Sequence, residues 1–84
     1  MIGRDPSADV WLAASGVSRR HARIVVTAEQ SSLHDLGSKN GTRLRGVLLS
    51  SAADLNNGDL ITIGPFEIVY GSADAPVSTE TLAT

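Results

Sequence analysis

The sequence has no cysteine among its 84 residues, so neither a disulfide framework nor a thiolate metal site is available. No apolar run approaches the roughly 20 residues that a membrane-spanning helix needs. The first ten residues also lack the charged and apolar regions of a signal peptide. We therefore expect one small cytoplasmic domain with a modest core, because so short a chain buries little surface.

The sequence is also poor in aromatic residues, and its C-terminal part has no lysine or arginine. The chain holds one tryptophan, one tyrosine and one phenylalanine, too few for a row of stacking platforms for bases. Residues 46–84 contain five acidic residues and no lysine or arginine, whereas residues 1–45 contain seven cations and four acids. The net charge of −2 argues against a general nucleic-acid binder. The positive first half can nevertheless direct a local field onto an acidic ligand.

Short apolar segments, rich in valine and isoleucine and separated by turn residues, predict strands and no helix. The expected strands are residues 9–12, 21–27, 32–36, a hairpin over 42–49, 59–64 and 66–70. Alternation in the second strand places Ala22, Ile24 and Val26 on the core face. The hairpin is expected to turn near Arg45-Gly46. Many short strands at this spacing predict an antiparallel sandwich or barrel.

The end of the sequence has a different character. From Gly71 onwards it is small and polar, with a proline and no alternation, which predicts a flexible tail over 71–84 after a folded domain of 1–70. Thr79 and Thr81 stand in this tail beside an acidic residue, where a kinase could reach them. A phosphate on either threonine could fold back onto the cationic loops and compete with other ligands.

The segment VSRRHARIVV (17–26) concentrates polar side chains at the start of an apolar run. Ser18, His21 and Asp35 supply the residue types of a hydrolytic triad, but no G-x-S-x-G elbow or oxyanion loop accompanies them. The two histidines form no metal-binding motif. The segment GSKNGT (37–42) has the wrong order for a Walker loop. We therefore expect no enzyme, no metal and no cofactor.

What remains for the basic loops is an anion. Nucleic acid is one alternative, since RRHAR and KNGTRLR are basic, although the few aromatics and the net negative charge disfavour it. A compact phosphate is the other, because arginine presents a planar fork of donors. Serine hydroxyls and loop N–H groups can complete such a cradle. The residues alone leave open whether the cationic loops converge.

Five blocks of the sequence resemble the forkhead-associated (FHA) domains, in the order and at the spacing of that family. They are IGR (2–4), DVWL (9–12), VSRRHA (17–22), LHDLGSKNGT (33–42) and GDLITIG (58–64). The combination of S-R-x-H with D-L-x-S-x-N-G-T is highly specific. The resemblance implies an all-β, FHA-type antiparallel sandwich of eleven strands. It also implies that loops at one end bind phosphothreonine peptides and that no catalysis occurs.

By position, the resemblance assigns roles to individual residues. Arg4 would bind the phosphate, Ser18 would donate its hydroxyl to a phosphate oxygen, and Arg19 would add a second cation. Lys39 would touch the phosphate or the peptide backbone, and Asn40 would bind the peptide main chain just after the phosphothreonine. The residues that would support this site structurally are Gly3, His21, Gly41 and Thr42.

The function implied is a phosphothreonine-peptide binding module of a bacterial signalling or regulatory protein linked to a Ser/Thr kinase. The partners would be phosphothreonine proteins, and neither nucleic acid nor membrane. The alternative is a scaffold that binds partners through its sheet faces or edge without phosphate. Its distinguishing feature would be that Arg4, Ser18 and Asn40 do not share one open groove.

The N-terminus departs from the family pattern. Family members begin with two strands before the IGR block, and the first of these pairs with the last strand, here residues 66–70. Because the chain starts at Met1, we expect these two strands to be lacking. Phe66–Tyr70 would then be an open edge that could pair with another molecule.

Overall fold

The computed structural model describes residues 1–71, which form nine strands and no helix. In chain order these are β1 (Ile2–Gly3), β2 (Val10–Trp11), β3 (Ala22–Val26), β4 (Ser31–Asp35), β5 (Arg43–Leu44), β6 (Val47–Leu48), β7 (Ala53–Leu55), β8 (Leu60–Ile63) and β9 (Phe66–Val69). No helix in this part of the chain could cross a membrane. Apart from Gly71, the predicted tail with Thr79 and Thr81 lies outside the described residues.

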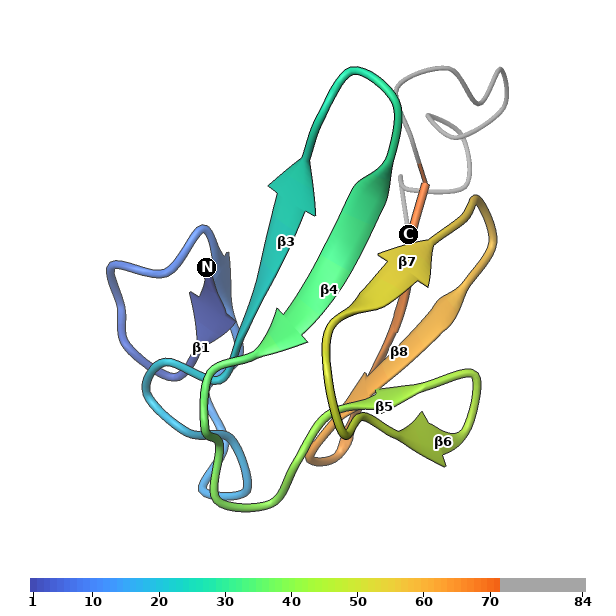
Figure 1. Cartoon of the computed structure of the whole chain (residues 1–84). Coiled ribbons are helices and arrows are strands. Elements are labelled where there is room, and N and C mark those ends of the chain that lie inside the picture. The colour runs from blue at the N-terminus through green and yellow to red at the C-terminus, as the bar shows by residue number, and fades with distance from the viewer. Residues whose placement is uncertain (72–84) are drawn as a thin grey trace.

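The strands form two sheets (Figure 1). One sheet has the order β2-β1-β3-β4-β7 and the other has the order β6-β5-β8-β9. Every neighbouring pair is antiparallel except β1 and β2, which run parallel. The expected all-β fold with predominantly antiparallel sheets is therefore confirmed.

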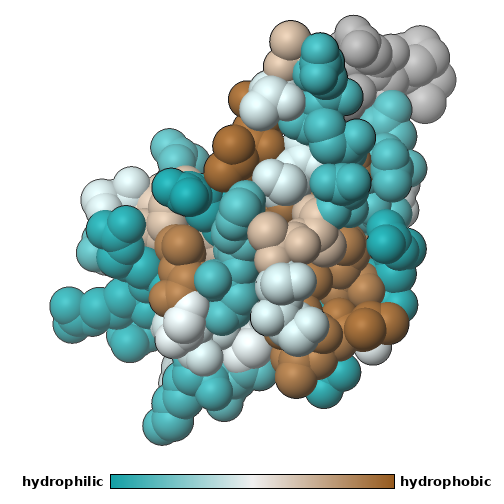
Figure 2. Space-filling view, viewed as in Figure 1, coloured by the Kyte–Doolittle hydropathy of each residue, from teal (hydrophilic) through white to brown (hydrophobic). Residues whose placement is uncertain are grey.

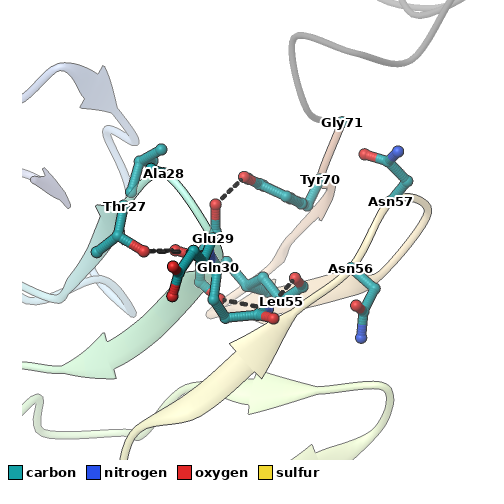
Figure 3. Close-up of a pocket in the computed structure, with 11 residues that line it drawn as sticks. Thr27, Ala28, Glu29, Gln30, Leu55, Asn56, Asn57, Tyr70 and Gly71 are labelled. Atoms are coloured by element: carbon teal, nitrogen blue, oxygen red, sulfur yellow. Dashed lines mark hydrogen bonds between the residues drawn. The ribbon is translucent and has the colours of Figure 1, made fainter.

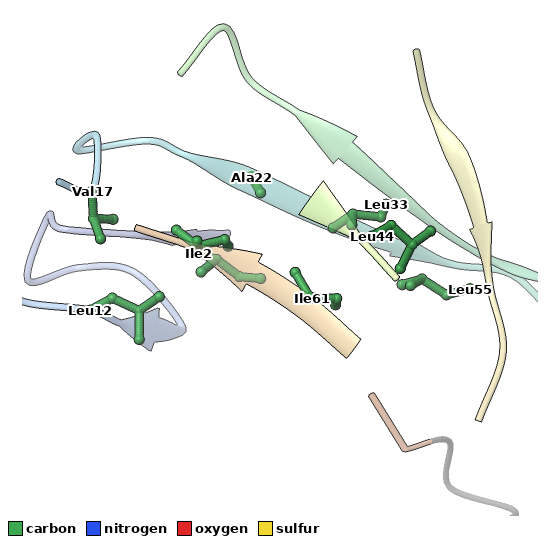
Figure 4. Close-up of a cluster of buried hydrophobic side chains, with 9 residues drawn as sticks. Ile2, Leu12, Val17, Ala22, Leu33, Leu44, Leu55 and Ile61 are labelled. Carbon is green, nitrogen blue, oxygen red and sulfur yellow. The ribbon is translucent and has the colours of Figure 1, made fainter. Parts of the chain in front are cut away.

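The hydrophobic core lies between the two sheets (Figure 4). Leu33 of β4 and Ile61 of β8 are completely buried, one from each sheet. Burying one such side chain stabilises the fold by about 1.5–3 kcal/mol. Leu12 and Val17 belong to the segment between β2 and β3, so the core also anchors that loop. The complete cluster consists of Ile2, Leu12, Val17, Ala22, Leu33, Leu44, Leu55, Ile61 and Ile63.

The β5–β6 hairpin turns where the sequence predicted. Leu44 pairs with Val47, so Arg45 and Gly46 form a two-residue turn, with φ angles of 51° and 81°. Two positive φ angles are the mark of a type I′ turn, whose twist suits a hairpin. Arg45 is the one non-glycine with positive φ among the described residues, and its Nη1 lies 2.7 Å from Oδ2 of Asp59. This ion pair helps to hold the strained residue in place.

Three details of the strand prediction were wrong. No strand was expected at Ile2–Gly3, yet these residues form β1 and pair with β2 and β3. No strand was expected around Ala53–Leu55, yet these residues form β7 and pair with β4. Val26 was expected in the core, but it is 70% exposed. It pairs with Ser31 at the end of β3, next to the turn that leads to β4. The alternation of the strand continues there, but the core does not reach so far.

β9 forms one edge of the four-stranded sheet in the described part of the chain. The N–H and C=O of Tyr70 bond to Asp59 and Gly58 on the β8 side. By alternation, the N–H and C=O groups of Glu67 and Val69 point away from β8. The open edge expected at this strand is therefore present, and self-association through it stays a prediction.

Candidate functional site

Three loops at one end of the sandwich carry the predicted site residues. Arg4 follows β1, Ser18 and Arg19 precede β3, and Lys39 and Asn40 lie between β4 and β5. Because β1, β3 and β4 are neighbouring antiparallel strands, the end of β1, the start of β3 and the end of β4 lie at the same end of the sheet. The cationic loops therefore converge, which the residues alone had left open.

Arg4 is fixed to the loop before β3 by its backbone and by its side chain. Its N–H donates to the carbonyl of Ser18, and its Nε–H donates to the carbonyl of Val17, both at 3.0 Å. The side chain is exposed, and its terminal nitrogens have no partner within residues 1–71. The fork of the guanidinium is thus held in place and is free to bind an anion.

The hydroxyl group of Ser18 is oriented by the neighbouring loop. The backbone N–H of Lys39 donates to Oγ of Ser18 at 2.9 Å. Because this oxygen accepts a bond, the O–H of Ser18 remains available as a donor. A second link joins the loops where Nδ2 of Asn40 donates to the carbonyl of Gly16 at 3.1 Å. That bond leaves the amide oxygen of Asn40 and its second N–H for a ligand.

The side chains of Arg19 and Lys39 are less constrained. Both residues are exposed, and each is tied to the site through its backbone. Asp5 lies nearby with a lowered pKa, caused first by hydrogen bonds from Ser7 and further by the charges of Arg19 and Arg20. Arg19 and Lys39 thus add exposed positive charge around the fixed Arg4 and Ser18. The carboxylate of Asp5 attracts part of this charge.

His21 connects the loop of Ser18 to the loop of Asn40. The side chain is fully buried, and the N–H of Ser18 donates to its Nδ1 at 2.9 Å. Because Nδ1 accepts, the proton must be on Nε2, which lies 2.8 Å from the carbonyl of Gly41 and donates to it. One neutral imidazole therefore sets the distance between the Ser18 loop and the Asn40 loop.

Asp35 and Ser38 organise the loop between β4 and β5, a role that the sequence analysis gave to neither residue. Oδ2 of Asp35 accepts the N–H groups of Gly37 and Ser38 at 3.0 Å. Oδ1 accepts the hydroxyls of Ser38 and Thr42, and Thr42 is fully buried. Oγ of Ser38 in turn accepts the N–H of Gly41 at 2.9 Å. An aspartate two residues before Gly37 is a turn signal that could have indicated this arrangement.

The environment of Asp35 has opposing effects on its pKa. Burial raises the pKa of Asp35, but the hydrogen bonds from Ser38, Thr42 and Gly37 together lower it by a larger amount, so the net shift is downward. A carboxyl whose pKa is depressed by folding stabilises the protein above its unfolded pKa, about 3.9. That contribution is lost as the pH falls through the lower pKa of the folded state.

Asp35→Asn should therefore reduce stability at pH 7 by an amount on the order of 1 kcal/mol, or about 4–8 °C in melting temperature. The difference from wild type should shrink as the pH falls below about 4, because wild-type Asp35 then becomes protonated. Thermal melts between pH 7 and pH 2.5 measure this. Asp54→Asn, at an exposed position of β7, is the control and should keep the wild-type profile. A constant gap between Asp35→Asn and wild type across the range would contradict the assignment.

Two glycines allow close approaches within these loops. A Cβ on Gly3 would lie 2.0 Å from the carbonyl oxygen of Arg19, so no other residue fits there without a backbone shift. Gly41 has a φ of +85°, and its Cβ would lie 2.5 Å from Cδ1 of Leu48. A side chain at either position would collide with a neighbour, and the supporting roles of these glycines stay a prediction.

The comparison with known families gives a clear result. The FHA domain family matches residues 1–64 of the chain. The chain belongs to the FHA family. The match spans β1 to β8 and includes every predicted site residue.

Relatives of this FHA domain include two bacterial regulators. An oxoglutarate dehydrogenase inhibitor of Corynebacterium jeikeium is 41% identical over 75 residues, covering 87% of this chain and 51% of that protein. The glycogen accumulation regulator GarA of Mycobacterium tuberculosis is 40% identical over 68 residues, covering 81% of this chain and 41% of that protein. The chain thus spans about half the length of these relatives or less.

A solved FHA structure is similar over most of the fold. It comes from a structural and functional analysis of phosphothreonine-dependent FHA domain interactions, and it matches with a TM-score of 0.81 at 36% identity. The match covers 86% of this chain and 74% of that one. The family and the arrangement of its two sheets are therefore shown by sequence and by structure.

A groove of this FHA domain lies away from these loops (Figure 3). It has a volume of about 550 Å³ and lies at the opposite end of β3 and β4, between the turn joining them and the loop after β7. Glu29 is the one charged residue among those that line it, and none of the predicted site residues does so. The negative charge of Glu29 disfavours an anion there.

Proposed function

We propose that this FHA domain binds proteins that carry a phosphorylated threonine. The observation that carries the proposal is a pair of donors without a partner in residues 1–71: the fixed fork of Arg4, and the Ser18 O–H left free by the Lys39 N–H bond. Arg4 is bonded to the carbonyls of Val17 and Ser18 in the loop that carries Ser18, so a single phosphate can meet both donors together. The phosphothreonine-dependent interactions of the similar FHA structure support this ligand.

Each remaining residue has a distinct task in this proposal. Arg19 and Lys39 are exposed and add positive charge around the phosphate, with a long-range attraction that salt screens. Asn40 presents its free amide atoms to the main chain of the peptide and so fixes its position relative to the phosphate. His21 and Asp35 bind no ligand, but they hold the loops at the right separation.

The biological setting proposed is regulation downstream of a Ser/Thr kinase, in the cytoplasm of a bacterium. The names of the two relatives, an inhibitor and a regulator, support a regulatory role, and a binding function requires no catalysis by this domain. We also propose that residues 1–70 form the folded domain and 71–84 a tail attached to it.

A phosphate-independent scaffold is the second candidate. Val47 and Leu48 on β6 are 68% and 51% exposed, and Figure 2 shows apolar surface gathered over this hairpin. The open edge of β9 adds unpaired backbone groups. Such surfaces favour protein contacts that do not need a phosphate.

A peptide titration separates the two candidates. A library of phosphothreonine peptides should yield ligands whose unphosphorylated forms bind at least about 100-fold more weakly, because the loss of charge-assisted bonds to Arg4 and Ser18 costs about 3 kcal/mol or more. Phosphoserine forms should bind less tightly than phosphothreonine forms, as expected for an FHA domain with a pocket for the threonine methyl group. Calorimetry measures all three. Equal affinity for phosphorylated and unphosphorylated peptides would favour the scaffold and reject the proposal.

A further inference from the structure

Trp11 is the single tryptophan of the chain, and it lies on β2 next to the Arg4 loop. β2 pairs in parallel with β1, and this register places Trp11 beside Gly3. The side chain is 57% exposed, so it contributes little to the core. Its Nε1–H donates to the backbone carbonyl of Arg4 at 3.0 Å. An indole left in solvent but bonded to one particular carbonyl suggests a role at that carbonyl.

The Arg4 carbonyl belongs to the peptide unit that joins Arg4 to Asp5. The N–H of the same unit donates to the carbonyl of Arg19 at 3.2 Å. A peptide unit is planar, so one bond at each end fixes its orientation. Trp11 holds one end and the Arg19 loop holds the other. This peptide unit therefore connects β2 to the loop that carries Arg19.

We propose that Trp11 is a positioning residue of the phosphothreonine site, acting through Arg4. The inference rests on the proposed function and adds a residue to it that touches no ligand. The N–H and Nε–H of Arg4 bond to Ser18 and Val17 on one side. Within the described residues, Trp11 supplies the bond on the carbonyl side.

Without that bond, the peptide after Arg4 can rotate, and of the bonds named above Arg4 keeps those of its N–H and its Nε–H. The guanidinium would then sample more orientations before a phosphate arrives. A ligand must restrict this freedom on binding, so its affinity falls. Loss of the Trp11 bond should therefore change ligand affinity and the order of the Arg4 loop. It should leave the core unchanged, because the core cluster does not include Trp11.

Trp11→Phe tests the proposal because it keeps an aromatic ring on β2 and removes only the N–H donor. We expect it to weaken phosphothreonine-peptide binding by about three- to tenfold, the effect of one lost hydrogen bond. Its melting temperature should stay within about 4 °C of wild type, as for other surface substitutions. The matched control is Val10→Ala, at the neighbouring position of β2, which is 40% exposed and should bind like wild type.

A double-mutant cycle with Arg4→Ala separates positioning from general structural damage. If Trp11 acts through the Arg4 side chain, Trp11→Phe should have no further effect on affinity in the Arg4→Ala background. Amide hydrogen exchange at Asp5 in the free protein should also be faster in Trp11→Phe than in wild type. Wild-type affinity in Trp11→Phe, or the same fold loss in both backgrounds, would overturn the proposal.

The proposed function and this inference can fail separately. If the wild-type domain does not bind phosphothreonine peptides, the proposed function fails. Exchange at Asp5 and the NMR signal of the Arg4 Nε–H in the free protein then still test the positioning. Unchanged exchange and an unchanged signal in Trp11→Phe would overturn the role of Trp11 on their own.

Discussion

Arg4→Ala should weaken phosphothreonine-peptide binding by about 10- to 150-fold while leaving the domain folded. Hydrogen bonds to a charged group contribute about 1.5–3 kcal/mol, which corresponds to that range of affinity. The fold should survive because the Arg4 side chain is exposed and, within residues 1–71, makes one hydrogen bond, from Nε to the carbonyl of Val17. Its backbone bond to Ser18 does not depend on the side chain.

Arg4→Lys should recover only part of the affinity. A lysine keeps the charge, but it has no planar fork and cannot bond to Val17 and chelate a phosphate at once. Raising the salt concentration should weaken the wild type more than Arg4→Ala, because fewer charge contacts remain to be screened in the variant.

The control for the arginine prediction is Arg23→Ala. Arg23 is also exposed, but it lies on β3 outside the three loops and should affect binding little. Calorimetry with one phosphothreonine peptide gives the affinities, and thermal melts show that each variant is folded. Wild-type affinity in a folded Arg4→Ala would remove Arg4 from the site and leave Ser18 without its proposed partner.

Most of the fold could be predicted where local sequence and tertiary structure agree. The Arg45-Gly46 turn is an example, since glycine at its second position allows the positive φ that a two-residue hairpin needs. β7 could not be predicted, because Ala53–Leu55 is a short segment whose strand state comes from pairing with β4. Val26 shows the opposite case. Its alternation was correct, but burial depends on how far the core extends, and periodicity does not report that.

The candidate site could also be predicted only in part. Motif residues such as Arg4, Ser18 and Asn40 could be named from the family resemblance, but their mutual arrangement depends on backbone carbonyls that a sequence does not display. The bond from Trp11 to the Arg4 carbonyl is of this kind, because it needs the parallel register of β1 and β2. Asp35 was considered only as a member of a catalytic triad. Its four hydrogen bonds show that it holds the loop instead.

His21→Ala should destabilise the whole domain and weaken peptide binding together. The substitution removes both bonds of a fully buried ring and leaves the N–H of Ser18 and the carbonyl of Gly41 without their partner. An unsatisfied buried group costs about 1–3 kcal/mol, and the cavity left by the ring adds to this. We expect a loss of about 3–5 kcal/mol, or at least about 10 °C in melting temperature. That is a large part of the 5–15 kcal/mol typical of small domains.

Two further variants divide this effect between the two ends of the ring. His21→Asn keeps an acceptor near the Nδ1 position for the Ser18 N–H, and His21→Gln keeps a donor near the Nε2 position for the Gly41 carbonyl. Each should recover part of the stability, and His21→Asn should recover more of the binding, because its bond orients the loop of Ser18 directly. His34→Ala is the control, since His34 is half-buried and its ring bonds, within the described residues, to the Ser32 hydroxyl alone. A His21→Ala variant with wild-type stability and no peptide binding would make His21 a direct ligand of the phosphopeptide, and its proposed role as the connector of two loops would be wrong.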